Sequence, residues 1–430
     1  MALSLPGNPD LEHLRRDARR LQRAVRSGQA DAIAYAARHH PEGAPAEPVA
    51  FPLADAQLVV ARGYGFVSWP RLRAYLRAAA PLSRDPAALD PATLDPASVE
   101  PGSASAIVAL ACLTYTDRDE PERWAQAAAQ LAEDPSLTDR DVFVAAAAGD
   151  PDALREHLAA DPASATREGG PFRWPPLLYV VYSRVPQRDA VAAVRVLLEG
   201  GADPDSGYLW QGLPTAFTAL TGVFGEGEGG PSRQPRHPQW RALAELLLAR
   251  GADPNDRQSL YNRMFNRDDS HLELLLAHGL GHPASEVWAR RTGEAAETID
   301  EMVERQVGWA RSHGFDDRLA LLAAHGLVPD PPPEDGPRDI HRASTPAAVR
   351  AAVTSGADVD ARRDGRTALH QAAFMDDVAL VRALLEAGAD PEARDDVHRT
   401  RPLEWARWAR AEAAGRVLAS VTRTTGGPGA

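Results

Sequence analysis

The sequence predicts an all-α protein, in which a curved solenoid of stacked helix pairs follows a small helical N-terminal domain. Three observations lead to this prediction. Apolar residues in the first 80 positions follow helical spacing, and a motif of leucines, glycine, alanine and aspartate recurs along the rest of the chain. Aromatic residues make up only 6% of the 430 residues, so the core must be built mainly from alanine and leucine packed between helices.

The composition excludes several classes of function. All 47 basic residues are arginine, which excludes mechanisms that need a lysine amine. The net charge of −13 argues against broad binding to nucleic acids or anionic membranes. Cys112 is the single cysteine, which excludes an intramolecular disulfide and a cysteine-built zinc site. Because no apolar run approaches the ~20 residues of a membrane span and the start lacks a signal pattern, we expect a cytoplasmic protein.

The N-terminal domain is expected over residues 1–80. Asp10 is a suitable cap for its first helix, and Ser68 with Pro70 is a suitable start for its last helix. Residues 81–103 then carry an Asp-Pro or Glu-Pro pair every five residues, which predicts a stiff linker. The apolar stripe of the first helix consists of Leu11, Leu14, Ala18, Leu21 and Val25.

Residues 104–424 repeat one pattern, and residues 425–430 are expected to be a disordered tail. The tail of a helix runs into Gly-Ala-Asp-Pro at Gly201–Pro204, Gly251–Pro254 and Gly388–Pro391, with weaker copies elsewhere. Leucines bury one face of each helix, glycine takes the left-handed cap position, and Asp-Pro forms the turn. The repeat glycines stand at positions 201, 251, 279, 326, 356 and 388.

This pattern resembles the ankyrin repeat, a turn–helix–helix unit of about 33 residues. The clearest copy is Asp364–Ala373, which leads through Val381–Leu385 to Gly388–Asp390. The resemblance implies an ankyrin-like helical repeat solenoid with an irregular middle, and a role for His341 and His370 in bonding the turn backbone. The segment Leu53–Arg62, with Gly65–Pro70, resembles the helical module that precedes bacterial ankyrin arrays.

Large side chains near the turns between repeats indicate a binding groove. If Pro175–Leu178 aligns with the start of a repeat, Tyr179 and Tyr182 occupy outward positions of its first helix. Stacked repeats would bring an aromatic and arginine-rich set together on the concave face, although aromatic residues often simply fill space in a core. The predicted partner-binding residues are Phe172, Arg173, Trp174, Tyr179, Tyr182, Tyr208, Trp210, Tyr261, Asn262, Arg263 and Arg267.

The sequence therefore favours a non-catalytic scaffold that binds another protein on the concave face. The alternative is a small-molecule enzyme or ligand receptor that uses the same groove, with the 225–238 segment as a lid. The residues Gly225–Gly230 in this segment match the sequence pattern of a dinucleotide-binding loop. That loop must follow a strand, whereas a helix is expected before Gly225, and the two glutamates of the stretch would repel phosphate, so we do not interpret it as a nucleotide site. No catalytic motif is found, and we expect no metal, cofactor, nucleic acid or membrane partner. A basic face on the first helix, Arg15–Arg26, is interpreted as solvated or interdomain.

Overall fold

The computed structural model describes most of the chain and confirms the predicted all-α repeat fold, with five short strands among its described residues. Residues 90–103 of the predicted linker and the predicted tail, residues 425–430, lie outside the described part. The described ranges are 5–89, 104–283, 287–293, 297–328, 340–343, 345–363 and 365–422.

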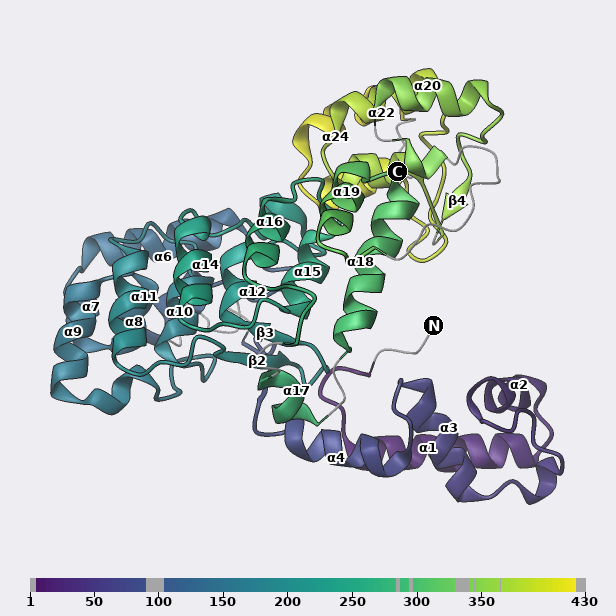
Figure 1. Cartoon of the computed structure of the whole chain (residues 1–430), viewed down its shortest axis with the longest axis horizontal. Coiled ribbons are helices and arrows are strands. Elements are labelled where there is room, and N and C mark those ends of the chain that lie inside the picture. The colour runs from purple at the N-terminus through teal and green to yellow at the C-terminus, as the bar shows by residue number, and fades with distance from the viewer. Residues whose placement is uncertain are drawn as a thin grey trace, which may run out of the picture.

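The N-terminal residues form a separate helical unit (Figure 1). Its first helix begins where the Asp10 carboxylate accepts hydrogen bonds from the backbone of Glu12 and His13, and its last helix begins after Ser68, as predicted. The unit has one small core of its own, and a second core, centred on Leu14, Leu72 and Tyr75, is shared with Leu209 and Trp288 of the following part of the chain. Its helices are α1 (Leu11–Arg26), α2 (Ala30–His39), α3 (Leu53–Gly63) and α4 (Trp69–Ala79), with a 3₁₀ turn at Pro48–Ala50.

The middle of the chain stacks helix pairs in two rows (Figure 1). Helices α8, α10, α12 and α15 contact one another in sequence and form the inner row, while α9, α11 and α14 form the outer row. One continuous hydrophobic core joins them. The helices are α5 (Ala104–Ala111), α6 (Pro121–Glu133), α7 (Leu137–Arg140), α8 (Val142–Ala147), α9 (Pro151–Ala160), α10 (Pro176–Tyr182), α11 (Ala190–Glu199), α12 (Ala219–Phe224), α13 (Gly230–Arg233), α14 (Trp240–Ala249), α15 (Arg257–Arg263) and α16 (Ser270–Ala277), with a 3₁₀ turn at Pro162–Ala165.

A three-stranded sheet lies across the turns of this array. Its first strand falls within residues 81–103, so the start of that segment is not a linker as predicted. Strand β1 (Ser83–Arg84) runs parallel to β2 (Gly207–Trp210), and β2 pairs antiparallel with β3 (Ala216–Thr218). The residue pairs are Ser83 with Leu209 and Tyr208 with Phe217. The start of the predicted linker is therefore hydrogen-bonded to the repeats. The Tyr75 hydroxyl also donates to the carbonyl of Gly212 at 2.6 Å, which ties the N-terminal unit to the same sheet.

The C-terminal repeats have a second core, distinct from that of the middle array. Inner helices α21 and α23 contact each other, as do outer helices α22 and α24. Helices α17 (Val287–Thr292), α18 (Ile299–His313) and α19 (Asp316–Ala324) lie between the two sets in sequence. The C-terminal elements are a 3₁₀ turn at Ile340–Arg342, α20 (Pro346–Thr354), β4 (Arg362–Arg363), β5 (Arg366–Thr367), α21 (Ala368–Phe374), α22 (Val378–Glu386), α23 (Pro402–Trp408) and α24 (Glu412–Ala419).

The six repeat glycines adopt the backbone conformation that the sequence predicts. Each has a positive φ, from +72° at Gly326 to +98° at Gly251. A side chain at such positions is strained by its Cβ, so glycine ends each helix and lets the chain turn into the next repeat. The histidines before two of these glycines also lie as predicted at helix C-termini, where His278 and His325 contact the carbonyls of Leu274 and Leu321.

A buried histidine makes stability depend on pH. His237 is 2% exposed, its Nδ1 accepts the backbone N–H of Gln239 at 3.1 Å, and its Nε2 donates to Gln187 at 2.6 Å. Burial and the nearby Arg184 guanidinium lower the pKa of His237 to about 3. The unfolded chain therefore binds more protons than the folded chain below about pH 6.5, and stability falls as the pH falls.

We expect the His237→Gln variant to lose this part of the pH dependence. Between pH 7.5 and pH 5, His237 should cost the native chain up to about 2 kcal/mol, because each unit of pKa shift corresponds to about 1.4 kcal/mol. Burial raises the pKa of Asp205 to about 6, so this carboxyl group makes the folded chain more stable as the pH falls. This opposite contribution is the same in both proteins. Urea unfolding of both proteins at the two pH values measures the difference. Identical pH dependence in the two proteins would contradict this assignment.

Candidate functional site

A cleft of about 610 Å³ lies between the middle array and the concave face of the C-terminal repeats. One wall comes from the segment that carries Glu228 and from Tyr261 on α15, followed by Phe265. The opposite wall comes from β5, α21, α23 and the turn between the last two repeats. That wall consists of Arg366, Gln371, Phe374, Asp395, Val397, His398, Thr400, Glu404, Trp405 and Trp408.

Asp395 organises the C-terminal wall. Its buried carboxylate accepts hydrogen bonds from the backbone of Val397, His398 and Thr400, from the Thr400 hydroxyl at 2.6 Å and from the Trp405 indole at 3.2 Å. Burial alone would raise the pKa of Asp395, but the hydrogen bonds from Thr400, His398 and Trp405 outweigh it and hold the pKa well below its ordinary value. The carboxylate therefore stays charged, and it fixes Trp405 against the turn.

The aromatic rings of the cleft contact one another. Phe374 stacks against Trp408 at 6.0 Å between ring centroids and meets Trp405 edge-on at 6.0 Å. Phe265 meets Tyr261 edge-on at 5.4 Å on the opposite wall. Trp408 is 46% exposed, which is unusual for so large an apolar side chain. The cleft thus presents an ordered aromatic surface that solvent reaches.

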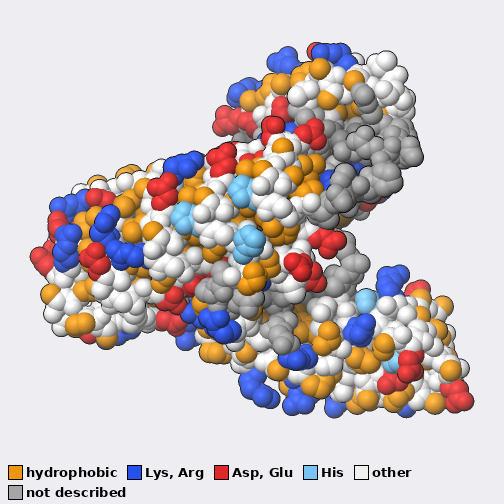
Figure 2. Space-filling model, in the orientation of Figure 1, with side chains coloured by type: hydrophobic (Ala, Val, Ile, Leu, Met, Phe, Trp, Pro, Cys, Tyr) orange, Lys and Arg blue, Asp and Glu red, His pale blue; other side chains and the backbone are white. Residues whose placement is uncertain are grey.

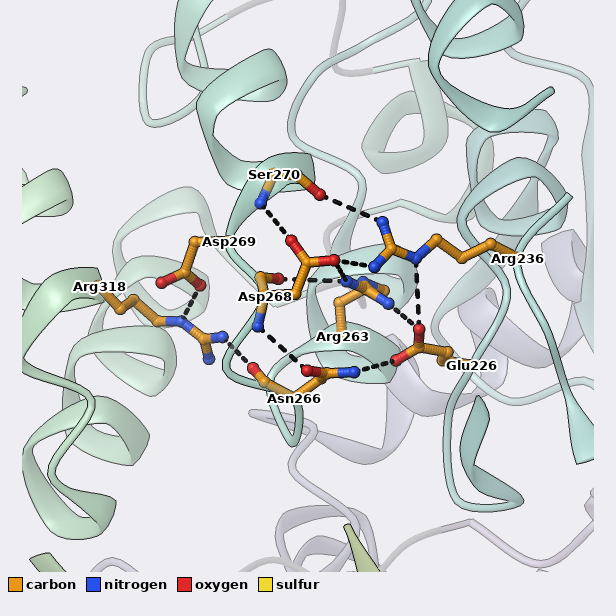
Figure 3. Close-up of polar contacts among 8 residues, drawn as sticks. All are labelled: Glu226, Arg236, Arg263, Asn266, Asp268, Asp269, Ser270 and Arg318. Carbon is orange, nitrogen blue, oxygen red and sulfur yellow. Dashed lines mark hydrogen bonds and ion pairs between the residues drawn. The ribbon is translucent and has the colours of Figure 1, made fainter. Parts of the chain in front are cut away.

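A buried ion network holds the wall that carries Glu228 and Tyr261 (Figure 3). Arg263, which is fully buried on α15, pairs with Glu226 and donates to the backbone carbonyl of Asp268 at 3.1 Å. Arg236 forms ion pairs with two carboxylates, that of Glu226 at 3.4 Å and that of Asp268. Burial, together with the nearby Arg318 guanidinium, lowers the pKa of Arg263 to about 10. Arg263 still remains charged at neutral pH, and its two terminal nitrogens are paired while its buried Nε has no hydrogen-bond partner among the described residues.

Further polar contacts extend this network to Arg318 on α19 (Figure 3). Asn266 donates to Glu226 at 3.3 Å and accepts the backbone N–H of Asp268 at 3.0 Å. Arg318 on α19 pairs with Asp269 at 2.6 Å and donates to the carbonyls of Met264 and Asn266. These bonds fix the turn after α15, which contains Phe265.

The 225–238 segment is held at Glu226, which is only 5% exposed. Gly230 lies against Phe374 and Ala409 of the C-terminal repeats, and residues Gly230–Arg233 form the short helix α13. A loop fixed in this way cannot open as a lid without breaking the buried pair between Glu226 and Arg263. Glu228, two residues on, is exposed at the cleft.

Two polar groups of the cleft have unused hydrogen-bonding capacity. The guanidinium of Arg366 lies over the rings of Trp309 at 5.9 Å and Trp405 at 5.5 Å, and no ion pair to it is found among the described residues. The amide oxygen and nitrogen of Gln371 have no hydrogen-bond partner among these residues either. Gln371 separates the cleft from a neighbouring cavity of about 270 Å³.

The structure buries most of the groove predicted from residues 172–210, and this corrects the expected surface. Four of the aromatic residues are at most 1% exposed, and Phe172 is 4% exposed. The Trp174 ring packs against Tyr179, Tyr182 and Tyr208, with centroids 4.9–5.3 Å apart. The four residues that are at most 1% exposed are Trp174, Tyr179, Tyr182 and Tyr208.

The sheet explains this burial. Strand β2 carries Tyr208 over the outward positions of α10, and Arg84 of β1 donates to the carbonyl of Arg173 at 3.0 Å. Two of the tyrosine hydroxyls are hydrogen-bonded inside: Tyr179 donates to the carbonyl of Gly169 at 2.8 Å and Tyr182 to that of Thr218 at 2.9 Å. These side chains form a core under the sheet, so they cannot contact a partner.

The remaining predicted residues divide between the cleft and its support. Tyr261 lines the cleft, whereas Asn262 and Arg263 are buried behind it. Arg267 is exposed and lies over Phe315 at 4.5 Å, at the smaller cavity. Arg173 is exposed, and Trp210 is partly buried with its indole N–H donating to the carbonyl of Thr114 at 3.0 Å. The structure therefore brings one of the eleven predicted residues to the cleft.

The sequence contained a signal for the residues that were missed. Tyr179 and Tyr182 were selected because they stand four and seven positions after the start of a repeat. In the copy that begins at Thr367 these positions are Gln371 and Phe374, and in the copy that begins at Arg401 they are Trp405 and Trp408. All four line the cleft. The positional rule holds in the regular repeats, where no sheet covers the inner helices.

The histidines of the turns bond backbone as the resemblance implies. His370 contacts the Thr367 hydroxyl at 2.8 Å and the carbonyl of Thr400 at 3.1 Å, and His341 contacts the carbonyl of Ala361 at 2.8 Å. No group of three or more potential metal ligands occurs in the part of the chain that the structure describes. Of the helices described, none has the length and apolar content that crossing a bilayer requires. On the face shown in Figure 2, basic side chains are interspersed with acidic ones.

Comparisons with known proteins agree with the repeat geometry at the C-terminal end. The ankyrin repeat family matches residues 364–396, which include α21 and α22. Among solved structures, the chain is similar to the ankyrin repeat domain of human ASB11, with a TM-score of 0.28 and 18% sequence identity over 67% of this chain and 99% of that one. No curated protein sequence matches the chain. Residues 364–396 are thus an ankyrin repeat.

Proposed function

We propose that this protein is a non-catalytic interaction scaffold that holds an extended segment of a partner protein in the cleft between α15 and the C-terminal repeats. The observation that carries the proposal is the half-exposed Trp408, stacked on Phe374 in an ordered aromatic wall. Ankyrin repeats are generally protein-interaction modules, and part of this wall belongs to the matched repeat.

The chemistry of the cleft suits such a segment. Tryptophan, tyrosine and arginine dominate the binding energy of protein interfaces, and Trp405, Trp408, Tyr261 and Arg366 all line this surface. The walls are fixed in advance by the Asp395 hydrogen bonds and by the Glu226–Arg263 pair, so little conformational entropy is lost on binding.

A small-molecule ligand in the same cleft is the second candidate. Its volume of about 610 Å³ lies within the range of about 300–1,000 Å³ that is usual for small-molecule sites. The proposal also includes a cytoplasmic location, a bacterial type of ankyrin array and an N-terminal module formed by residues 1–80. These points are supported by the sequence patterns alone.

Replacing Trp408 with alanine should reduce the amount of partner recovered from cell lysate by about tenfold or more, as expected for an interface hot spot. The fold should be little affected, because Trp408 is 46% exposed. Quantitative affinity capture with the full chain measures this effect. Val49→Ala is the matched control, since Val49 is 79% exposed on the N-terminal unit. Equal recovery of every partner by all three proteins would contradict the proposed function.

A further inference from the structure

We propose that the partner segment presents a basic side chain, a guanidinium or an ammonium group, between Glu228 and the rings of Phe374 and Trp408. This inference rests on the proposed function and adds the chemistry of the occupant. The 225–238 segment places Glu228 near these two rings. Gly230 of the segment lies against Phe374 and Ala409, and Arg233 donates to the backbone carbonyl of Trp408 at 3.4 Å. The segment therefore brings Glu228 to the Phe374–Trp408 end of the cleft.

The charges that line the cleft favour a cation. Glu404 is neutralised by the neighbouring Arg401, whose Nε donates to it at 2.9 Å. Of the remaining charged groups in the lining, Asp395 is buried and its carboxylate is already hydrogen-bonded, so Glu228 is the carboxylate that a ligand can reach, and Arg366 is the guanidinium of the lining. The chain as a whole carries a net charge of −13, which attracts a basic partner at longer range. The exposed carboxylate of Glu228 and the overall charge are thus complementary to a basic ligand.

Glu228 is available to form the contact. Its carboxylate is exposed, and the contact that the structure gives it is with a neutral group, the Tyr261 hydroxyl, which donates to it at 2.9 Å. Burial and the Glu228 charge both raise the pKa of Tyr261, so this hydroxyl keeps its proton and continues to donate. The hydrogen bond orients the carboxylate through one oxygen and leaves the other oxygen for a charged donor.

The rings of this region already bind guanidinium groups of the chain itself. Arg233 lies over Trp408 at 5.8 Å, Arg366 over Trp405 at 5.5 Å and Arg305 over Tyr261 at 5.6 Å. The electron-rich faces of Trp and Tyr attract cations, and the attraction grows when water is excluded. Trp408 remains 46% exposed despite its contacts with Phe374 and Arg233, and this exposed part of the ring is what the basic side chain of a partner would contact.

The test uses an array of immobilised heptapeptides probed with the full chain. The central residue is arginine, lysine, glutamate or the neutral norleucine, and the flanking positions are randomised. We expect retention on arginine- and lysine-centred peptides to exceed that on norleucine-centred peptides by about tenfold, from one ion pair and one cation–π contact. Glu228→Gln should remove most of this preference, because glutamine keeps the Tyr261 hydrogen bond but not the charge. Glu304→Gln, at an exposed position on α18, is the control and should keep the preference.

The outcomes separate this inference from the proposed function. Retention that is highest for glutamate- or norleucine-centred peptides, and is lost in Trp408→Ala, would overturn the basic occupant and support the cleft as a peptide site. A preference for basic peptides that persists in Glu228→Gln would also overturn the inference. If no class of peptide is retained in a way that depends on Trp408, both the inference and the proposed function are wrong.

Discussion

Replacement of Arg263 by methionine is expected to lower the free energy of unfolding of the repeat array by about 3–5 kcal/mol, the usual cost of removing one partner from a buried ion pair. Arg263 is fully buried, and its loss leaves the carboxylate of Glu226, itself 5% exposed, without its buried cation. Methionine retains much of the volume, so the effect reports charge more than packing. Urea unfolding followed by tryptophan fluorescence measures it.

Two further variants make this prediction specific. Arg195→Met removes an exposed arginine from α11 and should change the free energy of unfolding by less than about 0.5 kcal/mol. Adding Glu226→Gln to Arg263→Met should recover part of the loss, because the double variant no longer buries a carboxylate that has lost its fully buried partner and keeps only Arg236 at 3.4 Å and Asn266 at 3.3 Å. A loss below about 1 kcal/mol in Arg263→Met, or no recovery in the double variant, would show that the network in Figure 3 does not hold the cleft wall.

Truncation of Trp174 to alanine should destabilise the middle array by about 3–5 kcal/mol, as expected for removing a large aromatic side chain from a core. The Trp174 ring is fully buried among Tyr179, Tyr182 and Tyr208. Tyr179 and Tyr182 cannot move to fill its place without breaking their hydroxyl hydrogen bonds. Thermal unfolding and urea unfolding of the full chain measure the loss.

Trp408→Ala serves as the matched comparison for Trp174→Ala. It removes the same side chain from a 46% exposed position, so it should lower the free energy of unfolding by less than about 1 kcal/mol while it reduces binding in the cleft by about tenfold or more. If Trp174→Ala instead leaves stability unchanged and selectively removes partner binding, the aromatic set at residues 172–210 is a surface and the burial described above is wrong.

The regular parts of the fold could be predicted from local sequence. Six glycines after helix ends, five of which are rich in leucine, define the repeats, and their positive φ angles follow from the need to turn the chain without a Cβ clash. His370 stands three residues after Thr367, so it can cap α21 and also reach the next turn. These features depend only on contacts within a repeat or with the next repeat. In a stacked array each repeat contacts its neighbours in the sequence, so these contacts can be predicted without a structure.

The site could be predicted less well because it depends on long-range contacts. Tyr179 and Tyr182 occupy the right repeat positions, but β1, which comes about 100 residues earlier, adds to a sheet over them. Arg263 is predicted to bind the partner, but it is buried, and the carboxylate that it pairs with, Glu226, lies 37 residues away in a segment expected to be a loop. The wall formed by Phe374, Trp405 and Trp408 follows from the same positional rule, applied to repeats that no strand covers.

Site-specific photo-crosslinking tests the location of the partner most directly. A photoreactive side chain at Val397, which is 70% exposed on the rim of the cleft, should form covalent adducts with the partner in cells that produce the full chain. The same group at Arg173, exposed beside the buried aromatic set, should form none. Adducts at Arg173 without adducts at Val397 would place the partner on the middle repeats and contradict the cleft as the binding site.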